Sequence, residues 1–296
     1  MSFFLFPGQG SQQPGMGHDF YEASGPARET LDAAEQTLGP GFLEKIFNGS
    51  PEEVNDTRVA QAGLVAVETA VARHLVANGL TPSGCAGHSV GEISALVCAK
   101  ALDFTDALRI AQLRARFMSE DVPKGGMAAV AGLDVGAIAE HLPEEVNVAN
   151  YNGPQQTIIS GSEDGLAQAE EQLKAAGARR VIRLPVSGPF HSPFMREASI
   201  RFREALQDFA IEPPGHRFIS SVSGVEESDP EHMRELLSTQ LTAPVRWTQV
   251  LQRIGEVAAV EAGPGKVLQG IAKRMPGAPA VSPVGAYEEA QAYCAD

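Results

Sequence analysis

The chain has 296 residues, which suffices for one large domain or for a core that carries a smaller inserted one. Hydrophobic residues make up 43% and charged residues 20% of the sequence, a composition typical of soluble globular proteins that excludes a disordered or fibrous chain. Aspartate and glutamate outnumber lysine and arginine by 37 to 23, so the net charge of −14 disfavours nucleic acid and anionic membranes as partners.

The three cysteines, Cys85, Cys98 and Cys294, form no C-x-x-C pair, so we expect neither a disulfide framework nor a thiolate metal site. The apolar run at 3–6 has no basic segment before it and is too short for a signal peptide or a membrane span. We therefore expect a cytoplasmic protein in a reducing compartment.

Hydrophobic periodicity in the first part of the chain predicts strands that alternate with amphipathic helices. The expected elements are a strand at 3–6 before the glycine-rich loop 7–10, a helix at 59–77, a turn at 82–84, a strand at 85–88, a helix from Val90, and a helix at about 105–120 with Thr105 as its N-cap. Alternating strands and helices are typical of a parallel sheet covered on both faces.

From Met127 the pattern changes to shorter segments. They are a strand at 127–132, a helix at 134–141, strands at 146–149 and 157–160, a helix at 163–176, and a strand at 181–186. This βαββαβ order is that of a ferredoxin-like unit. We expect it to be a subdomain of about 125–187, inserted into an α/β core formed by 1–124 and 188–296.

After Gly188 the longer elements return. They are a helix at about 193–209, a strand at 218–222, helices at 230–240 and 247–255, and a strand at 257–260 that leads into Gly263-Pro264-Gly265. The tail beyond Pro276 has no clear period.

The pentapeptide at 87–91, Gly-His-Ser-Val-Gly, is a G-x-S-x-G motif between a predicted strand and a predicted helix. In that context Ser89 lies on a sharp turn, and the helix after it offers backbone N–H groups and the positive end of its dipole to an oxyanion. The motif predicts a nucleophilic serine. The alternative is a glycine-flanked turn without catalytic meaning.

A serine nucleophile needs a base, and the chain offers seven histidines. His88 neighbours Ser89 and is expected to point to the other face of the strand, whereas His74 and His232 are expected to face solvent. His191 lies in a turn just after the inserted unit, among large apolar residues that could exclude water. We predict His191 as the base, with a packing role as the alternative.

Arg114 is expected to point inward from its helix. Its neighbours three and four positions away, which are Ile110, Ala111, Phe117 and Met118, are all apolar. A buried guanidinium needs an anion, because an unpaired buried charge is costly. Two partners remain open, an internal Asp or Glu and the carboxylate of a substrate.

Nucleotide and metal signatures fail on inspection. The loop at 8–13 lacks the third glycine of G-x-G-x-x-G, Gly263-Pro264-Gly265-Lys266 is followed by Val267 instead of Ser or Thr, and no H-E-x-x-H occurs. No cofactor and no metal ion is expected.

The residues resemble, nearly from end to end, the malonyl-CoA:acyl carrier protein transacylases of fatty acid synthesis and the related acyltransferases of polyketide synthases. The matching segments are FPGQGSQ at 6–12, GHSVGE at 87–92, LRARFM at 113–118, GMAAV at 126–130, NVANYN at 147–152, GPFHS at 188–192, PVRW at 244–247 and EAGPG at 261–265. The resemblance implies an α/β-hydrolase-like core with a ferredoxin-like subdomain, in agreement with the order of the predicted elements.

The resemblance implies a role for each matching site residue. Ser89 is implied as the nucleophile, His191 as its base, and Arg114 as the clamp for the free malonyl carboxylate. Gln240 matches the position whose main-chain carbonyl orients the histidine.

Three further residues come from the same resemblance. Gln9 is implied to flank the oxyanion site, with the backbone N–H of Val90 as a second donor. Phe190 precedes the histidine, as is usual in members that prefer malonyl over methylmalonyl groups.

The implied reaction is ping-pong transfer of a malonyl group from malonyl-CoA to the phosphopantetheine thiol of an acyl carrier protein. We expect a monomer with a local basic dock for the acidic carrier. The candidate docking residues are Lys174, Arg179, Arg180, Arg183, Lys266, Lys273 and Arg274. The alternatives are a polyketide or malonate decarboxylation partner, a serine thioesterase or other acyl hydrolase, and an idle carrier-binding module.

Overall fold

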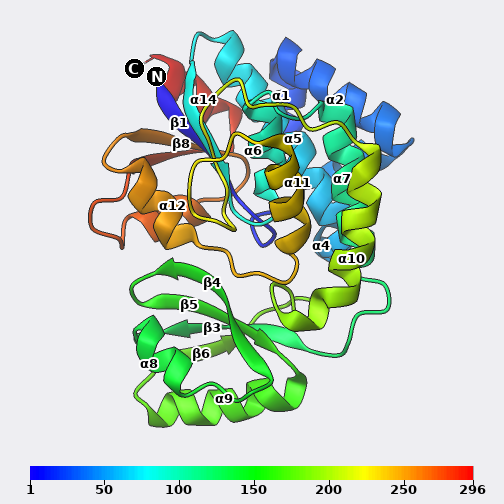
Figure 1. Ribbon diagram of the computed structural model, residues 1–296. Helices are drawn as coiled ribbons and strands as arrows, with labels where there is room; N and C mark the ends of the chain where they lie inside the picture. The colour runs from blue at the N-terminus through cyan, green and yellow to red at the C-terminus, as the bar shows by residue number, and fades with distance from the viewer. Residues whose placement is uncertain (296) are drawn as a thin grey trace.

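The computed structural model describes residues 1–295 as two β-sheets with helices packed around them. The upper sheet in Figure 1 is parallel and the lower sheet is antiparallel, and the two termini lie close together at the upper left. The predicted fold class, an α/β core with a parallel sheet and a ferredoxin-like unit, is confirmed.

The parallel sheet has the strand order β7-β2-β1-β8-β9. Its strands are β1 (Ser2–Phe6), β2 (Pro82–Gly87), β7 (Phe218–Ile219), β8 (Ala258–Ala262) and β9 (Ala280–Val284). Successive side chains of β1 enter different cores: Phe4 packs in one hydrophobic cluster, and Phe3 and Leu5 pack in another. The central strand is therefore buried on both faces, as the continuous apolar run predicted.

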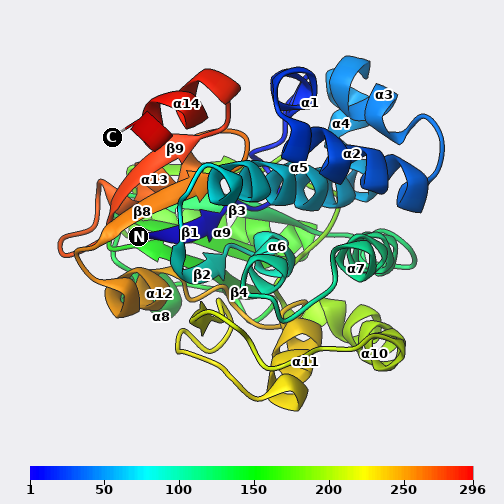
Figure 2. The same cartoon turned by 90° about the horizontal axis from the view of Figure 1, so that it is seen from above.

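Helices cover both faces of this sheet (Figure 2). They are α1 (His18–Ala23), α2 (Gly25–Leu38), α3 (Phe42–Asn48), α4 (Pro51–Asn55), α5 (Thr57–Ala77), α6 (Gly91–Cys98), α7 (Phe104–Phe117), α10 (Arg196–Ala205), α11 (Pro230–Thr239), α12 (Trp247–Ile254), α13 (Val267–Ala272) and α14 (Tyr287–Ala295), with 3-10 turns at Pro193–Met195 and Leu206–Asp208. Within the described chain, α5 is the one helix long and apolar enough to cross a membrane. Since 83% of its apolar window is buried inside the protein, it has the burial of a core helix.

The antiparallel sheet has the strand order β4-β5-β3-β6, which a βαββαβ unit produces. Its elements are β3 (Gly126–Ala131), α8 (Val135–Glu140), β4 (Val146–Gly153), β5 (Gln156–Gly161), α9 (Glu163–Ala175) and β6 (Arg180–Arg183). Both helices lie on the face of the sheet that points away from the parallel sheet (Figure 1). The edge strand β4 pairs with Val245, whose N–H and carbonyl bond Ala149 and Tyr151 at 2.8 Å each, and this contact fixes the antiparallel sheet beside the core.

Several local predictions were wrong. The turn expected at 82–84 is the first half of β2, where Gly84 leaves room for the ring of Phe3 and so serves packing instead of turning. Helix α7 is capped by Asp103, because its carboxylate accepts the N–H groups of Thr105 and Asp106.

Differences also occur later in the chain. Strand β7 ends at Ile219, and the residues after it turn toward Glu92. The tail without a clear period contains β9 and α14, and α14 gave no apolar stripe because Ala290 is its one buried residue.

Candidate active site

Ser89 lies on a tight turn between β2 and α6. Its φ of 52° is in the left-handed region that non-glycine residues rarely adopt, a strain that proteins keep mainly at functional sites. A Cβ atom on Gly87 would collide with the backbone of Gly91, and one on Gly91 would collide with the carbonyl groups of Phe6 and Pro7. The two glycines of the motif are therefore required by the close approach of strand, loop and helix.

His191 faces Ser89 from the turn at 188–192. Its Nε2 lies 2.8 Å from Ser89 Oγ, while its Nδ1 lies 2.8 Å from the Gln240 carbonyl oxygen and 3.2 Å from the Ala243 carbonyl oxygen. Carbonyl oxygens only accept, so Nδ1 carries the proton and Nε2 is left to accept the serine O–H. The geometry gives the imidazole the tautomer that a general base needs.

The His191 ring is held neutral. The residue is 4% exposed, and burial together with the charge of Arg114 lowers the pKa of its imidazole from the ordinary value to about 3. Its φ of 57° is a second left-handed conformation in the site, and the hydroxyl of Ser192 stabilises the turn by donating to the Pro189 carbonyl at 2.6 Å.

Arg114 is buried, 1% exposed, and its guanidinium contacts only neutral groups. It donates from Nη1 to Gln61 Oε1 at 2.6 Å and from Nη2 to Gln240 Oε1 at 2.8 Å and to Ser89 Oγ at 3.1 Å. Its Nε has no partner within residues 1–295, and no carboxylate there lies within ion-pair distance.

The guanidinium nevertheless keeps its charge. Burial lowers the pKa of Arg114 to about 10, with the opposing influence of Glu92 behind Gln240, so the side chain is protonated near pH 7. A buried cation with a free N–H beside the serine can bind an anion that enters the site.

Gln240 joins the two halves of the site. Its main-chain carbonyl accepts from His191, its side-chain Oε1 accepts from Arg114, and its Nε2 donates to the Ser89 carbonyl at 3.2 Å and to Glu92 Oε2 at 3.1 Å. The family resemblance had implied a role for the main-chain carbonyl of Gln240 but none for its side chain. We call Ser89, Glu92, Arg114, His191 and Gln240 the buried site cluster.

Gln9 and Val90 lie on the two chain segments that meet beside Ser89. Neither of their N–H groups donates to a protein acceptor within residues 1–295. The loop of Gln9 approaches the turn that carries Ser89 closely, since a Cβ on Gly8 would lie 2.6 Å from the His88 carbonyl oxygen. Two such N–H groups beside a serine hydroxyl match the donor arrangement of an oxyanion site.

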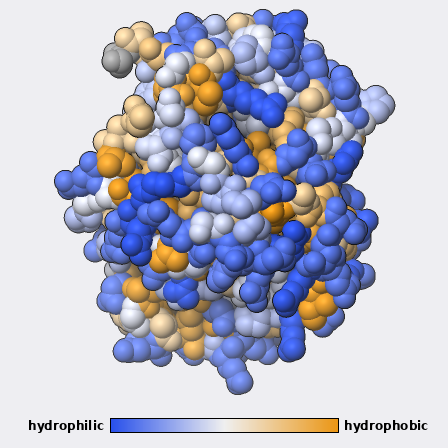
Figure 3. Space-filling view, turned by 45° about the horizontal axis from the view of Figure 1, so that its top comes forward, coloured by the Kyte–Doolittle hydropathy of each residue, from blue (hydrophilic) through white to orange (hydrophobic). Residues whose placement is uncertain are grey.

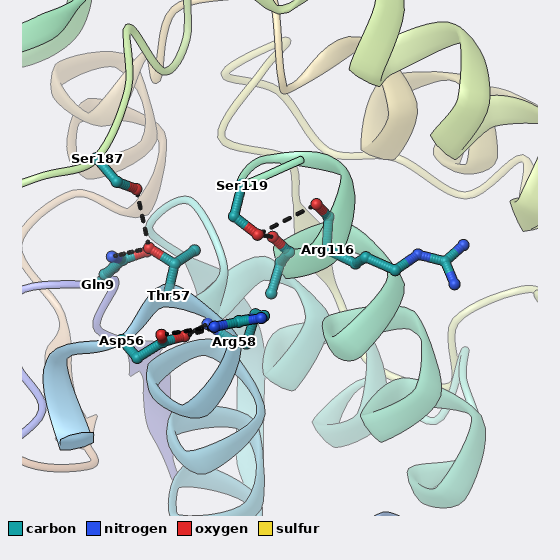
Figure 4. A network of polar contacts seen from close by, with 8 residues as sticks. Gln9, Asp56, Thr57, Arg58, Arg116, Ser119 and Ser187 are labelled. Carbon is teal, nitrogen blue, oxygen red and sulfur yellow. Dashed lines mark hydrogen bonds and ion pairs between the residues drawn. The ribbon is translucent and has the colours of Figure 1, made fainter. Parts of the chain in front are cut away.

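The Gln9 side chain is held by Thr57. Its Nε2 donates to Thr57 Oγ1 at 3.1 Å, and Thr57 in turn lies 3.5 Å from Ser187 Oγ (Figure 4). Gln9, Thr57 and Ser187 line a pocket of about 290 Å³. Thr57 therefore holds the Gln9 loop against the segment that leads to His191.

Phe190 directly precedes His191 in the chain. Its ring is 4% exposed and belongs to the main hydrophobic core.

Two residues of the site were missed by the sequence reasoning, Gln61 and Glu92. Each is a polar residue at a buried position within an apolar helix pattern, 0% and 2% exposed respectively. That conflict between residue type and pattern was the available signal.

The prediction that His74 faces solvent was wrong. Instead of facing solvent it is 3% exposed, bonds Ser24 Oγ at 2.8 Å, and packs against the rings of Phe20 and Tyr287. The aromatic partners come from α1 and α14, so the α5 sequence alone did not reveal them.

Two adjoining pockets open beside the turn that carries Ser89. The first, of about 350 Å³, is lined by the Gln9 loop, His88, Asn150 and Asn152. The second, of about 760 Å³, runs between the antiparallel sheet and α13, and shares Asn152, Gln156 and Ile271 with the first.

We call this second pocket the basic groove, because its lining contains Arg179, Arg180 and Arg274 and no acidic residue. In the described chain these three arginines form no ion pair, whereas Lys174, Arg183 and Lys266 pair with Glu170, Glu163 and Glu289. The groove is therefore a local positive region on a protein of net charge −14.

Comparison with known proteins defines the class. Residues 3–279 match the family described as acyl transferase domain, so the protein is an acyltransferase.

Individual relatives narrow the class. The malonyl CoA-acyl carrier protein transacylase of Bacillus subtilis (strain 168) is 41% identical over 283 residues, covering 92% of this chain and 89% of the relative. The acyl carrier protein S-malonyltransferase of Vibrio cholerae superposes with a TM-score of 0.93 at 35% identity, over 98% of each chain. A malonyl-transacylase solved in complex with its type II PKS acyl-carrier protein gives 0.94 at 34% identity, over 100% of this chain and 99% of the other. The chain belongs to the malonyl CoA-acyl carrier protein transacylase family.

Proposed function

We propose that the protein transfers a malonyl group from malonyl-CoA, through an ester on Ser89, to the phosphopantetheine thiol of an acyl carrier protein. The names of its relatives support the substrate and the acceptor. The observation that carries the proposal is the convergence of His191 Nε2 and Arg114 Nη2 on one oxygen, Ser89 Oγ, at 2.8 and 3.1 Å.

In the acylation half-reaction, His191 Nε2 takes the Ser89 proton while Oγ attacks the thioester carbonyl carbon. The N–H groups of Gln9 and Val90 stabilise the oxyanion of the tetrahedral intermediate. Collapse of the intermediate breaks the carbon–sulfur bond, and the imidazolium returns its proton to the departing CoA thiolate. The main-chain carbonyl of Gln240, 2.8 Å from Nδ1, stabilises the imidazolium during both steps.

The second half-reaction reverses the roles. The carrier thiol replaces CoA, His191 takes the thiol proton, and sulfur attacks the ester carbonyl. Collapse releases Ser89 Oγ, which recovers the proton from His191. No cofactor enters either step, and we propose that none is bound.

Arg114 supplies the preference for a dicarboxylic acyl group in this scheme. A malonyl carboxylate pairs with the buried guanidinium and satisfies its free N–H, whereas a neutral acetyl group leaves both the charge and that N–H unpaired. The buried ring of Phe190 before His191 is proposed to limit the space for a substituted malonyl group.

The basic groove is proposed to receive the anionic part of both substrates. CoA and the phosphopantetheine arm of a carrier each bear phosphate, which arginine binds well. Arg179, Arg180 and Arg274 line this groove and form no ion pair within residues 1–295, which supports them as docking residues over the ion-paired Lys174, Arg183 and Lys266. The acceptor is proposed to be a carrier of fatty acid or polyketide synthesis.

We further propose a cytoplasmic monomer in which 125–187 is a subdomain inserted into the 1–124 and 188–296 core. The three free cysteines support a reducing compartment. On the face shown in Figure 3, hydrophobic residues are interspersed with polar ones. The antiparallel sheet uses strands from 126–183 alone and has its own hydrophobic cluster, which supports the subdomain.

Trapping the acyl-enzyme tests the proposed function. Incubation with malonyl-CoA should add one malonyl group to the intact protein, and Ser89→Ala should abolish the adduct, as mass spectrometry would show. An adduct that persists in Ser89→Ala refutes the nucleophile assignment. An adduct that decays to free malonate equally fast with and without a carrier protein indicates a thioesterase or other hydrolase instead, and no adduct in the wild type indicates an idle carrier-binding module.

A further inference from the structure

Glu92 is a buried carboxylate for which the proposed chemistry has no direct use. It is the second residue of α6 and is 2% exposed. Four donors face it: Ser220 Oγ at 2.8 Å, the Ser221 N–H at 2.9 Å, the Ser221 hydroxyl, and Gln240 Nε2 at 3.1 Å. Such a donor set suits an ionised carboxylate, which accepts and never donates. A carboxylate bound in this way is fixed in place.

The donor and acceptor pattern around Gln240 allows one orientation of its amide. Arg114 Nη2, on one side, only donates, so the amide oxygen must face it. Glu92 Oε2 and the Ser89 carbonyl, on the other side, only accept, so the amide nitrogen must face them. A flipped amide would place its NH2 group against the Arg114 guanidinium, so that two donors face each other. It would also place its oxygen against Glu92 Oε2 and the Ser89 carbonyl, so that acceptors face each other.

We propose that Glu92 is a positioning residue for the dicarboxylic acyl group: its carboxylate fixes the Gln240 amide, and the amide oxygen fixes the Arg114 guanidinium beside Ser89 Oγ. The inference rests on the proposed function, because it needs Arg114 to bind the malonyl carboxylate. Glu92 also counters the charge of the guanidinium while no acyl group is bound.

Glu92→Gln tests this inference with little change in volume. An amide at 92 can donate as well as accept, so the side chain at 92 no longer forces the amide nitrogen of Gln240 toward it. The Ser89 carbonyl and Arg114 alone then hold the amide, and Arg114 has a less firmly fixed partner. We expect kcat/KM for malonyl-CoA to fall by about 10- to 100-fold, the effect of a lost hydrogen bond to a charged group. The value for acetyl-CoA should stay within about threefold of the wild type. An unchanged malonyl-to-acetyl ratio overturns the inference.

Glu68→Gln is the matched control. Glu68 is 0% exposed, and its carboxylate accepts a hydrogen bond at 2.5 Å from Ser94 Oγ, also on α6, instead of from Gln240 or Arg114. We expect this variant to change the melting temperature and leave the malonyl-to-acetyl ratio unchanged. A change in ratio as large as that of Glu92→Gln would mean that any buried carboxylate of the core affects selectivity, which refutes a specific role for Glu92.

Two further variants protect the test. Ser220→Ala removes one donor to Glu92 without changing a charge, so it probes the same connection if Glu92→Gln does not fold, with an expected shift of the ratio of about 2- to 5-fold in the same direction. In an Arg114→Ala background, Glu92→Gln should have no further effect on the ratio. Wild-type enzyme that does not prefer malonyl-CoA contradicts the proposed function, whereas a wild-type preference that Glu92→Gln retains contradicts the role of Glu92 alone.

Discussion

The buried site cluster and the basic groove lie next to each other but are built in opposite ways. In the cluster almost every polar atom has a partner from the protein, and Ser89, Arg114, His191 and Gln240 hold one another through bonds of 2.8 to 3.2 Å. In the groove, Arg179, Arg180 and Arg274 are exposed, and none is paired with an acidic side chain in the described residues.

This difference in burial predicts how strongly substitutions in each region should affect the enzyme. A buried charge interacts strongly with its neighbours, because little water screens it, so a single substitution there should change rate or selectivity greatly. Exposed charges contribute little each and are screened by salt. We therefore expect the reaction rate and the acyl selectivity to depend on the buried site cluster. We expect the affinity for CoA and for the acyl carrier protein to depend on the basic groove.

The largest of these effects is expected for the base. His191→Ala should slow acylation of Ser89 by malonyl-CoA by about 10²- to 10⁴-fold, the usual contribution of a positioned general base. Rapid-quench measurement of the acyl-enzyme gives the rate. His74→Ala is the control, since His74 is equally buried but bonds Ser24 on the far side of α5. A wild-type acylation rate in His191→Ala removes the base from the mechanism.

Arg114→Ala should separate selectivity from stability. Removing one partner of a buried charge pair typically costs about 2–5 kcal/mol, so kcat/KM for malonyl-CoA should fall by about 10²-fold or more, with far less change for acetyl-CoA. Steady-state kinetics with both thioesters measures this. Arg116→Ala serves as control, because Arg116 lies on the exposed face of the same helix and pairs with Glu120 at 3.8 Å. Equal losses on both substrates, with a lower melting temperature, would mean that Arg114 is structural.

The pH dependence provides a smaller but sharper test of the cluster. Acylation needs neutral His191, and because its pKa is lowered to about 3, the rate should stay constant as pH falls from 8 to 5. An ordinary histidine, with pKa near 6.5, would lose about tenfold by pH 5.5. Arg114 is the second cause of the lowered pKa after burial, so Arg114→Ala should move the acid limb toward higher pH. Single-turnover acylation from pH 8 to 5 checks the first expectation, and extending the series down to the His191 pKa of about 3 compares the acid limbs of wild type and Arg114→Ala. A midpoint near 6.5 in the wild type contradicts a buried neutral base.

The same contrast explains what the sequence could predict. The fold class followed from apolar periodicity and the change to short segments after Met127, since such patterns reflect burial within single elements. The sharp turn at Ser89 could be predicted from the two glycines that flank it, and the inward direction of Arg114 from its apolar neighbours on the helix. The catalytic roles of these residues stay predictions.

What sequence reasoning missed depends on contacts between distant segments. Gln61 meets Arg114 across 53 positions, and Gln240 meets Glu92 across 148, so no local pattern could pair them. Whether Arg183 forms an ion pair, and Arg179 forms none within residues 1–295, likewise depends on whether an acidic residue lies nearby in space. Composition alone had left all seven basic docking candidates equal.

The smallest expected effect concerns the groove. Removing the two neighbouring charges in Arg179→Ala/Arg180→Ala should raise KM for malonyl-CoA and for the carrier by about 3- to 10-fold, since exposed charge pairs contribute about 0.2–1 kcal/mol each. The value of kcat should stay unchanged, because neither arginine bonds the buried site cluster. Arg274 is left intact in this test, as its Nη1 donates to Gln156 Oε1 at 2.9 Å and its removal would also disturb the groove wall.

Salt and a matched variant decide whether that effect is electrostatic docking. At about 1 M salt the screening length falls to about 3 Å, so the difference in KM between the double variant and the wild type should nearly vanish. Arg183→Ala removes a cation from β6, the strand that begins at Arg180, but one that pairs with Glu163 and does not line the groove. The KM of this variant should therefore match the wild type at every salt concentration. A double variant that lowers kcat, or a KM difference that survives 1 M salt, would place these arginines in the chemistry or in the fold, and the separation between cluster and groove would fail.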